Sequence, residues 1–301
     1  MTLLETLTDA PDRTAEYLRD RPGVADLRDR LREDGLALHA LLALSILVLV
    51  APVLVATVVS TKELGIVTSL ADLAPGSHAV ANYRRALVDL EFGQFMLNSF
   101  VMSLAIVVGK LTVSVLAALA IVYYRIPYKN AAFLFVLFTL LLPVPVRFVP
   151  LFRLVTDLGW DNTMLAITVP YIASATTVFI LRQHFLSIPA SLVENAKLDG
   201  VGPFEFLWHV LVPMSKGVLV GVSVIMFVYA WNQYLWPLVI INDQSQQVVQ
   251  VGLGLLRGQA QAGDVAWALV MTGSMLTLLP PLVLLALFRK PLLQTFTIQQ
   301  K

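Results

Sequence analysis

Six long apolar stretches divide the chain, and they constrain its fold more than any other feature of the sequence. They run near residues 36–60, 97–123, 131–152, 163–181, 215–241 and 265–288. Each can cross the hydrocarbon core of a bilayer, which takes about 20 helical residues. A backbone in lipid must pair its own amides, and these stretches are too long and continuous to be barrel strands. We therefore predict an all-α integral membrane protein with six transmembrane helices.

Composition points to the same class and excludes several others. Hydrophobic residues make up 57% of the 301 residues and charged residues 14%, and the mean hydropathy is +0.77. An ordinary soluble domain is far less apolar. The chain has no cysteine, which excludes disulfides and thiolate metal sites. A formal net charge of +1 argues against a nucleic-acid partner. We expect neither a metal site nor a catalytic residue, because the four histidines lack ligand spacing: His39, His78, His184 and His209.

Lys and Arg are unevenly distributed between the connections, which predicts the orientation in the membrane. With the N-terminus inside, the inner connections and termini hold fourteen Lys and Arg, and the outer connections hold five. Residues 1–35, with six Arg and nine Asp or Glu, are then a charged cytoplasmic extension. Residues 36–290 form the transmembrane domain, and residues 291–301 form a cytoplasmic tail.

A polar island, residues 188–213, interrupts the apolar second half of the chain. Near its start, Ser191 and Glu194 have the spacing of a helix capping box. The island breaks at Asp199-Gly200 and restarts after Pro203. This order predicts two helices joined by a hinge. Local chemistry leaves two interpretations open: a handle for a partner protein, or a loop that only satisfies its own backbone.

Two cations lie inside predicted spans, where an ionised side chain costs at least about 2.5–3.5 kcal/mol. Arg147 stands among Pro143, Pro145 and Pro150, which must distort its helix and free carbonyl groups. It belongs either to a solute pathway or to a structural ion pair. Lys110 is near the middle of the second span. It has a functional role, extends to the membrane surface, or meets a polar group on a partner chain.

A polar and aromatic cluster lies near the outer end of the fifth span. Asn232 and Gln233 are costly to leave unpaired in lipid, so we expect them to face the bundle interior or a solute pathway. Trp231 and its aromatic neighbours suit either that pathway or the headgroup layer, where Trp and Tyr concentrate.

The polar island carries a motif with a fixed spacing. Glu194-Asn195-Ala196 is followed by three residues, Gly200, nine residues and Val210-Leu211-Val212-Pro213. This pattern resembles the EAA loop of ABC importer permeases, with Asn195 in place of Ala and two Val in place of Ile and Leu. In that family the loop is the coupling helix, which contacts the ATP-hydrolysing subunit.

The resemblance covers about residues 45–290. Over this range the chain is similar to permeases of the carbohydrate-uptake family, and most similar to those that import glycerol-3-phosphate. The segments that carry it are residues 98–100 (NSF), 143–147 (PVPVR), 159–163 (GWDNT), 173–176 (ASAT), 182–183 (RQ) and 231–237 (WNQYLWP).

This resemblance implies a type I importer permease with several partners. They are a homologous permease, two ATP-binding-cassette subunits that bind ATP and Mg, and an extracytoplasmic solute-binding protein. No cofactor is expected in this chain. The residues expected to couple to the ATPase are Glu194, Asn195, Ala196, Asp199 and Gly200. The candidates for the solute pathway are Arg147, Trp231, Asn232 and Gln233. The candidates for contact with the binding protein, in the last outer connection, are Gly252, Arg257 and Gln259.

Three alternatives remain beside this prediction. The same kind of subunit could serve a neutral sugar. A secondary transporter is less favoured, because no predicted span has Asp or Glu at its centre to couple an ion. An ATPase in its own right is disfavoured, because Gly109-Lys110 is followed by Leu111 inside a span and is no phosphate-binding loop.

Overall fold

The computed structural model describes residues 22–65, 73–263 and 266–292. Within these ranges every regular element is helical and no strand is present, as the sequence predicted. Most of the predicted N-terminal extension, residues 1–21, and most of the predicted tail, residues 293–301, lie outside the described residues. The chain divides into two compact units, Met1–Val55 and Ala56–Lys301.

Helix α2 (Pro22–Val59) supplies the described part of the first unit and continues into the second. Its part from Leu38 to Val59 has a mean hydropathy of 2.8 and is long enough to cross a membrane. Large apolar side chains along this part are exposed, among them Leu41, Leu44 and Leu49. Such a surface needs lipid or another chain around it.

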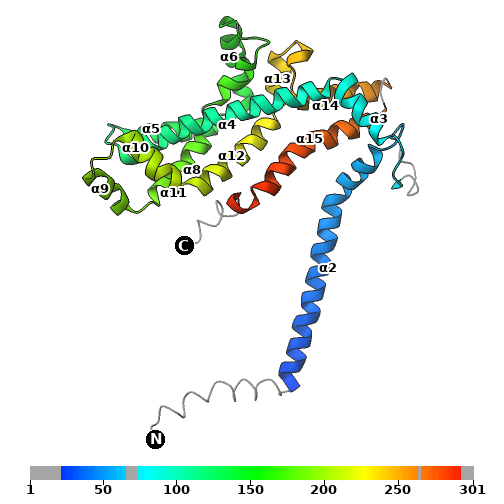
Figure 1. The fold of residues 1–301 in the computed structure, drawn as a ribbon, viewed down its shortest axis with the longest axis horizontal. Coiled ribbons are helices and arrows are strands. Elements are labelled where there is room, and N and C mark those ends of the chain that lie inside the picture. The colour runs from blue at the N-terminus through cyan, green and yellow to red at the C-terminus, as the bar shows by residue number, and fades with distance from the viewer. Residues whose placement is uncertain (1–21, 66–72, 264–265, 293–301) are drawn as a thin grey trace. The chain divides into compact units, whose positions relative to one another are not determined.

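Helix α4 (Phe92–Tyr123) is the longest helix of the second unit and packs beside α8 (Ala175–Leu186) and α12 (Lys216–Trp231), as Figure 1 shows. Its buried face repeats with helical spacing. Small side chains without exposed surface are frequent on that face: Ser99, Ser103, Ser114 and Ala118. Small residues let helix backbones approach closely in a membrane, where packing and hydrogen bonds hold helices together.

The remaining described helices are all shorter than α4. They are α3 (Ala79–Arg84), α5 (Lys129–Phe138), α6 (Val144–Asp157), α7 (Met164–Thr168), α9 (Ala190–Leu198), α10 (Pro203–Phe206), α11 (Val212–Met214), α13 (Leu235–Ile240), α14 (Val249–Ala262) and α15 (Trp267–Leu287). Arg85–Asp89 and Leu207–Leu211 are π-helical, and Thr139–Leu141, Val169–Tyr171 and Gln244–Gln246 are 3-10 helical.

Three helices of the described chain are long and apolar enough to span a membrane, and three bent pairs bring the possible number to six. The single helices are Leu38–Val59, Phe92–Tyr123 and Trp267–Leu287. The pairs are Lys129–Leu141 with Val146–Asp157, bent by 104°, Met164–Tyr171 with Ala175–Leu186, bent by 41°, and Pro203–Met214 with Lys216–Trp231, bent by 80°.

A proline lies at or beside each bend: Pro143, Pro170 and Pro213. Proline cannot donate a backbone hydrogen bond and its ring displaces the preceding turn, which bends or breaks a helix. The sequence predicted the first of these distortions. It also placed the end of the fifth span at residue 241, whereas α12 ends at Trp231. Pro237 cannot donate to Gln233, so α13 follows as a separate helix.

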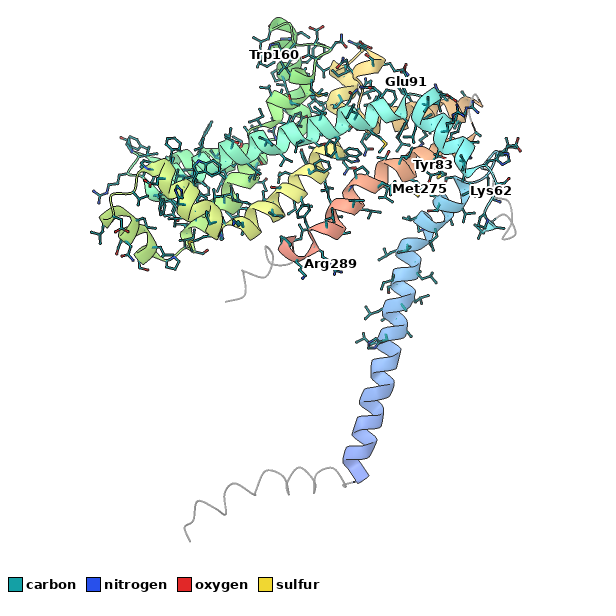
Figure 2. The ribbon with its side chains drawn as sticks, in the orientation of Figure 1. Lys62, Tyr83, Glu91, Trp160, Met275 and Arg289 are labelled. Carbon is teal, nitrogen blue, oxygen red and sulfur yellow. The ribbon has the colours of Figure 1, made fainter. Side chains whose placement is uncertain are left out.

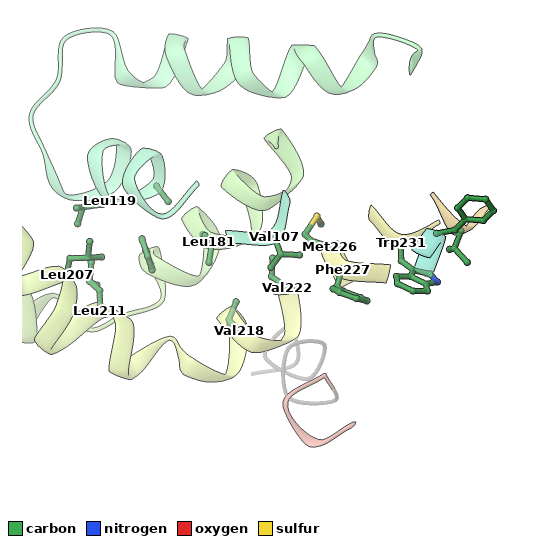
Figure 3. Packing of buried hydrophobic residues seen from close by; sticks show 14 of the residues in the cluster. Val107, Leu119, Leu181, Leu207, Leu211, Val218, Val222, Met226, Phe227 and Trp231 are labelled. Atoms are coloured by element: carbon green, nitrogen blue, oxygen red, sulfur yellow. The ribbon is translucent and has the colours of Figure 1, made fainter. Parts of the chain in front are cut away.

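Apolar side chains from the polar island and from several helices form one buried cluster (Figure 3). Leu207 and Leu211 of the island belong to it with Leu119 of α4, Leu181 of α8 and Val218 of α12. The second half of the island is therefore anchored in the bundle and is not a free loop.

Candidate functional site

The polar island folds as two helical parts joined at a glycine, as the sequence predicted. Helix α9 ends where Gly200 adopts a φ of 73°, a left-handed conformation that costs other residues energy. The amide of Val201 donates to the carbonyl of Ala196 at 3.0 Å, which closes the helix end in a Schellman motif. A Cβ at Gly200 would meet nothing within 4 Å. The backbone angle, and not crowding, therefore requires glycine here.

The capping box predicted at Ser191 and Glu194 is wrong. Helix α9 begins at Ala190, so Ser191 lies inside the first turn and the preceding position falls on Pro189. A capping box needs the hydroxyl residue at the N-cap, one position outside the helix.

The second half of the island is a continuous helical run from Pro203 to Met214. Its middle, Leu207–Leu211, is π-helical. Pro213, two residues after this segment, cannot donate to the carbonyl of His209, so the wider turn accommodates the missing hydrogen bond.

One face of the island is buried and the other is exposed. Three predicted coupling residues share the exposed face with three large apolar side chains: Glu194, Asn195, Asp199, Leu198, Phe204 and Trp208. Ala196 packs inward and is 9% exposed. Apolar side chains exposed beside carboxylates are typical of a surface that another protein covers.

Tyr123, at the end of α4, connects the island to the bundle. Its hydroxyl donates to the carbonyl of Phe185 at 2.8 Å, and its ring meets Phe206 edge-on with centroids 5.4 Å apart. A cavity of about 200 Å³ lies beside it, between α4 and the island. Sequence reasoning missed Tyr123, because a Tyr at the end of a span is equally typical of the membrane interface.

A larger cavity, of about 600 Å³, lies at the other end of α12. Its walls are apolar, aromatic and uncharged polar side chains: Phe148, Tyr171, Ile225, Val228, Tyr229, Asn232, Gln233, Tyr234, Leu235 and Trp236. A cavity of this size with a few polar groups is typical of small-molecule sites. We call it the outer cavity.

Two of the predicted pathway residues line the outer cavity. Asn232 accepts from Nε2 of Gln250 at 2.9 Å and donates to the carbonyl of Val228 at 2.8 Å, which holds its orientation. Gln233 is 9% exposed, and its Nε2 has no hydrogen-bond partner in the described structure. A buried unpaired amide is costly unless a ligand or water satisfies it. Gln233 thus places a buried amide without a partner at the wall of this cavity.

Arg147 is not among the walls of the outer cavity, but two wall residues are near it. It is exposed near the start of α6, next to the wall residue Phe148, and donates to the carbonyl of Leu142 at 3.2 Å. It is close enough to Tyr171, another wall residue, to interact with it electrostatically. No carboxylate pairs with Arg147 in the part of the chain that the structure describes, so its charge is available to an anion.

Trp231, the fourth predicted pathway residue, is placed differently. It is 1% exposed, and its Nε1 donates to the carbonyl of Thr277 at 3.0 Å. Its ring stacks on Phe227, with centroids 5.9 Å apart. Trp231 therefore joins α12 to α15 and is not among the walls of the outer cavity.

Helix α14 forms the last connection, which the sequence predicted to lie outside and to contact a binding protein. Arg257 and Gln259 are exposed on it. Gly252 is buried, and a Cβ there would lie 2.2 Å from the ring of Phe95 in α4. Arg257 and Gln259 are thus accessible on the surface of α14, whereas Gly252 allows α14 to approach α4.

Comparison with known proteins shows the family. Residues 110–290 match the family described as the binding-protein-dependent transport system inner membrane component. The chain belongs to this family. It is therefore a permease subunit, an inner-membrane component of a transport system, as the resemblance of its sequence indicated.

Individual relatives show which permeases of this family the chain resembles. The sn-glycerol-3-phosphate transport system permease protein UgpE of Brucella melitensis biotype 1 is 37% identical over 260 residues, 84% of this chain and 92% of the relative. UgpE of Pectobacterium atrosepticum is 39% identical over 261 residues, with the same coverage. The predicted likeness to glycerol-3-phosphate permeases is confirmed.

A solved structure supports the fold. A chain of a bacterial ABC transporter involved in the import of the acidic polysaccharide alginate aligns with a TM-score of 0.74 and 22% identity, over 86% of this chain and 96% of that one. The predicted fold class, an all-α ABC importer permease, is confirmed.

Substitution of Gly252 tests the packing of α14. Gly252→Val places two methyl groups against Phe95, and overpacking of this kind costs about 1–3 kcal/mol. Gly258→Val on the same helix meets open space and is the matched control. We expect the first variant, and not the second, to lower the melting temperature of the purified protein. Equal melting temperatures would contradict the close approach of α14 to α4.

Proposed function

We propose that the chain is a membrane subunit of an ATP-driven, binding-protein-dependent importer for glycerol-3-phosphate or a related glycerophospho compound. The observation that supports this choice of solute is the 36–39% identity to relatives named as glycerol-3-phosphate permeases. Arg147 beside the outer cavity supports it, because a guanidinium binds phosphate through paired hydrogen bonds.

The proposed assembly contains a homologous permease, two ATPase subunits that bind ATP and Mg, and an extracytoplasmic binding protein. The exposed face of the polar island supports contact with an ATPase, since carboxylates and large apolar side chains lie together there. The exposed residues Arg257 and Gln259 support contact with a binding protein.

A neutral sugar is the second candidate solute. Tyr171, Tyr229 and Tyr234 line the outer cavity, and flat apolar aromatic surfaces of this kind suit a sugar ring. The unpaired guanidinium of Arg147 favours the anion. A secondary transporter is less favoured, because membership in a binding-protein-dependent family and the exposed island both suit an ATP-driven complex.

The polar island and both termini face the cytoplasm in this proposal. Residues 1–35 and 291–301 are then cytoplasmic segments that flank the transmembrane domain. Figure 2 shows Lys62 and Tyr83 near the start of α15 and Arg289 beyond its end, so these ends would lie on opposite sides of the membrane. The excess of Lys and Arg in the predicted inner connections supports placing Arg289 on the cytoplasmic side.

Single cysteines test this orientation, since the chain has none of its own. Ser77→Cys and Gln259→Cys should react with an impermeant thiol reagent added to intact cells. Ser191→Cys should react only after the membrane is permeabilised. All three positions are exposed. Labelling of Ser191→Cys from outside would invert the topology and remove the island from the ATPase.

Substitution of Gly200, at the hinge, tests whether the polar island couples the ATPase to transport. Gly200→Val forces a β-branched residue into a left-handed conformation, at a cost of about 1–2 kcal/mol or more. Gly202→Val is the control, because Gly202 has an ordinary φ of −71° and open space around it. We expect Gly200→Val to lower uptake at least tenfold while the ATPase stays bound. Normal uptake would contradict a coupling role, and loss of the ATPase would indicate attachment.

Substitution of Arg147 tests whether this residue recognises an anionic solute. Uptake of labelled glycerol-3-phosphate by the purified complex in liposomes should fall about 10- to 100-fold in Arg147→Gln, because a hydrogen bond to a charged group contributes about 1.5–3 kcal/mol. Arg147→Lys, which keeps the charge without the paired donors, should fall between this variant and the wild type. Arg153→Gln, exposed on the same helix, is the control.

The outcome separates the two solutes. Full assembly of Arg147→Gln with wild-type uptake of glycerol-3-phosphate would remove Arg147 from recognition. Saturable uptake of a neutral sugar by the wild type, without uptake of glycerol-3-phosphate, would establish the second candidate.

A further inference from the structure

Lys110 is buried inside the bundle and does not extend to the membrane surface. It is 4% exposed and lies on the buried face of α4, one helical turn from Ile106 and Ser114. Its Nζ lies 3.9 Å from the sulfur of Met226 and 4.8 Å from the ring centroid of Tyr229. Of the interpretations that the sequence left open, extension of Lys110 to the membrane surface is therefore wrong. Packing within this chain also leaves it no surface to offer a partner chain.

No carboxylate pairs with Lys110 in the described chain, so its charge is poorly compensated. Its neighbours are a thioether, which is a weak acceptor, and an aromatic ring, whose face attracts a cation. An unpaired cation in a membrane bundle is destabilising, and a Met of similar length would pack here without that cost. The stability of the fold does not explain a lysine at this position.

Tyr229 connects Lys110 to the outer cavity. It is 50% exposed and belongs to the cavity wall, so Lys110 lies directly behind that wall. Arg147 lies beside another wall residue, Tyr171. The walls themselves contain no Asp or Glu. Two cations thus flank a cavity in which the described structure places no negative charge.

We propose that Lys110 determines the charge selectivity of the outer cavity, favouring anionic solutes of the phosphomonoester class through its positive potential behind Tyr229. This inference rests on the proposed function. The aromatic walls alone would accept a neutral sugar or an organic cation. A buried cation acts over several ångströms, because the protein interior screens it weakly. It opposes a cationic solute and stabilises an anionic one without touching either.

The test uses the complete complex, purified with its partner subunits and binding protein and reconstituted in liposomes. Lys110→Met removes the charge at nearly constant volume, and Lys110→Gln removes it while keeping a polar end. Lys62→Met, in an outer connection, removes the same charge far from the cavity. We expect both Lys110 variants to lower glycerol-3-phosphate uptake at least tenfold, with Lys62→Met within twofold of the wild type.

Thermal unfolding of the same complexes separates selectivity from structure. Loss of an uncompensated buried charge should leave the melting temperature of Lys110→Met unchanged or raise it.

Each other result overturns the inference. Uptake by Lys110→Gln or Lys110→Met within twofold of the wild type would show that the charge is unnecessary, and the proposed function would stand. A lower melting temperature or lost assembly in Lys110→Met would make Lys110 a structural residue. A wild-type complex that imports no glycerol-3-phosphate would overturn the proposed function itself, and the inference with it.

Discussion

Close packing along α4 is the interaction on which the rest of the structure depends. In lipid, apolar helix surfaces gain little by meeting one another, so dispersion contacts and hydrogen bonds must hold the bundle. Ser99 and Ser103 provide the small surface that close approach needs. Asn98 adds two hydrogen bonds, donating to the carbonyls of Ser245 and Gln247 at 2.8 and 2.9 Å. The polar island and the outer connections are built on opposite ends of this one helix.

The breaks in the other spans create the sites. Irregular backbone at membrane depth persists only where protein buries it or where it lines a cavity. Tyr171 is the last residue before the bend that follows Pro170, and Phe148 lies just after the bend at Pro143. Residues beside two of the bends therefore line the outer cavity. The bend after Pro213 separates the polar island from α12. The candidate sites of this chain are therefore concentrated where helices are interrupted.

The sequence predicted the features that depend on local chemistry and missed those that depend on helix rotation. Apolar length predicted the spans, and Asp199-Gly200 predicted the hinge, because a left-handed turn demands glycine. Tyr229 and Trp231 are two positions apart, yet one is half-exposed at the cavity and the other is buried. In a helix that is apolar all round, periodicity does not reveal which face meets which neighbour. The burial of Lys110 was hidden for the same reason.

Helix α12 physically links the two sites. It has 16 residues and is about 24 Å long at 1.5 Å per residue. Near its start Val218 shares a buried cluster with Leu211 of the polar island, and near its end Tyr229 lines the outer cavity. Hydrogen bonds within every turn make such a helix stiff along its axis, and an 80° bend separates it from the island at its start. Under the proposed coupling, movement of the island reaches the cavity through the wall that carries Tyr229, and so changes how closely Lys110 lies behind the solute.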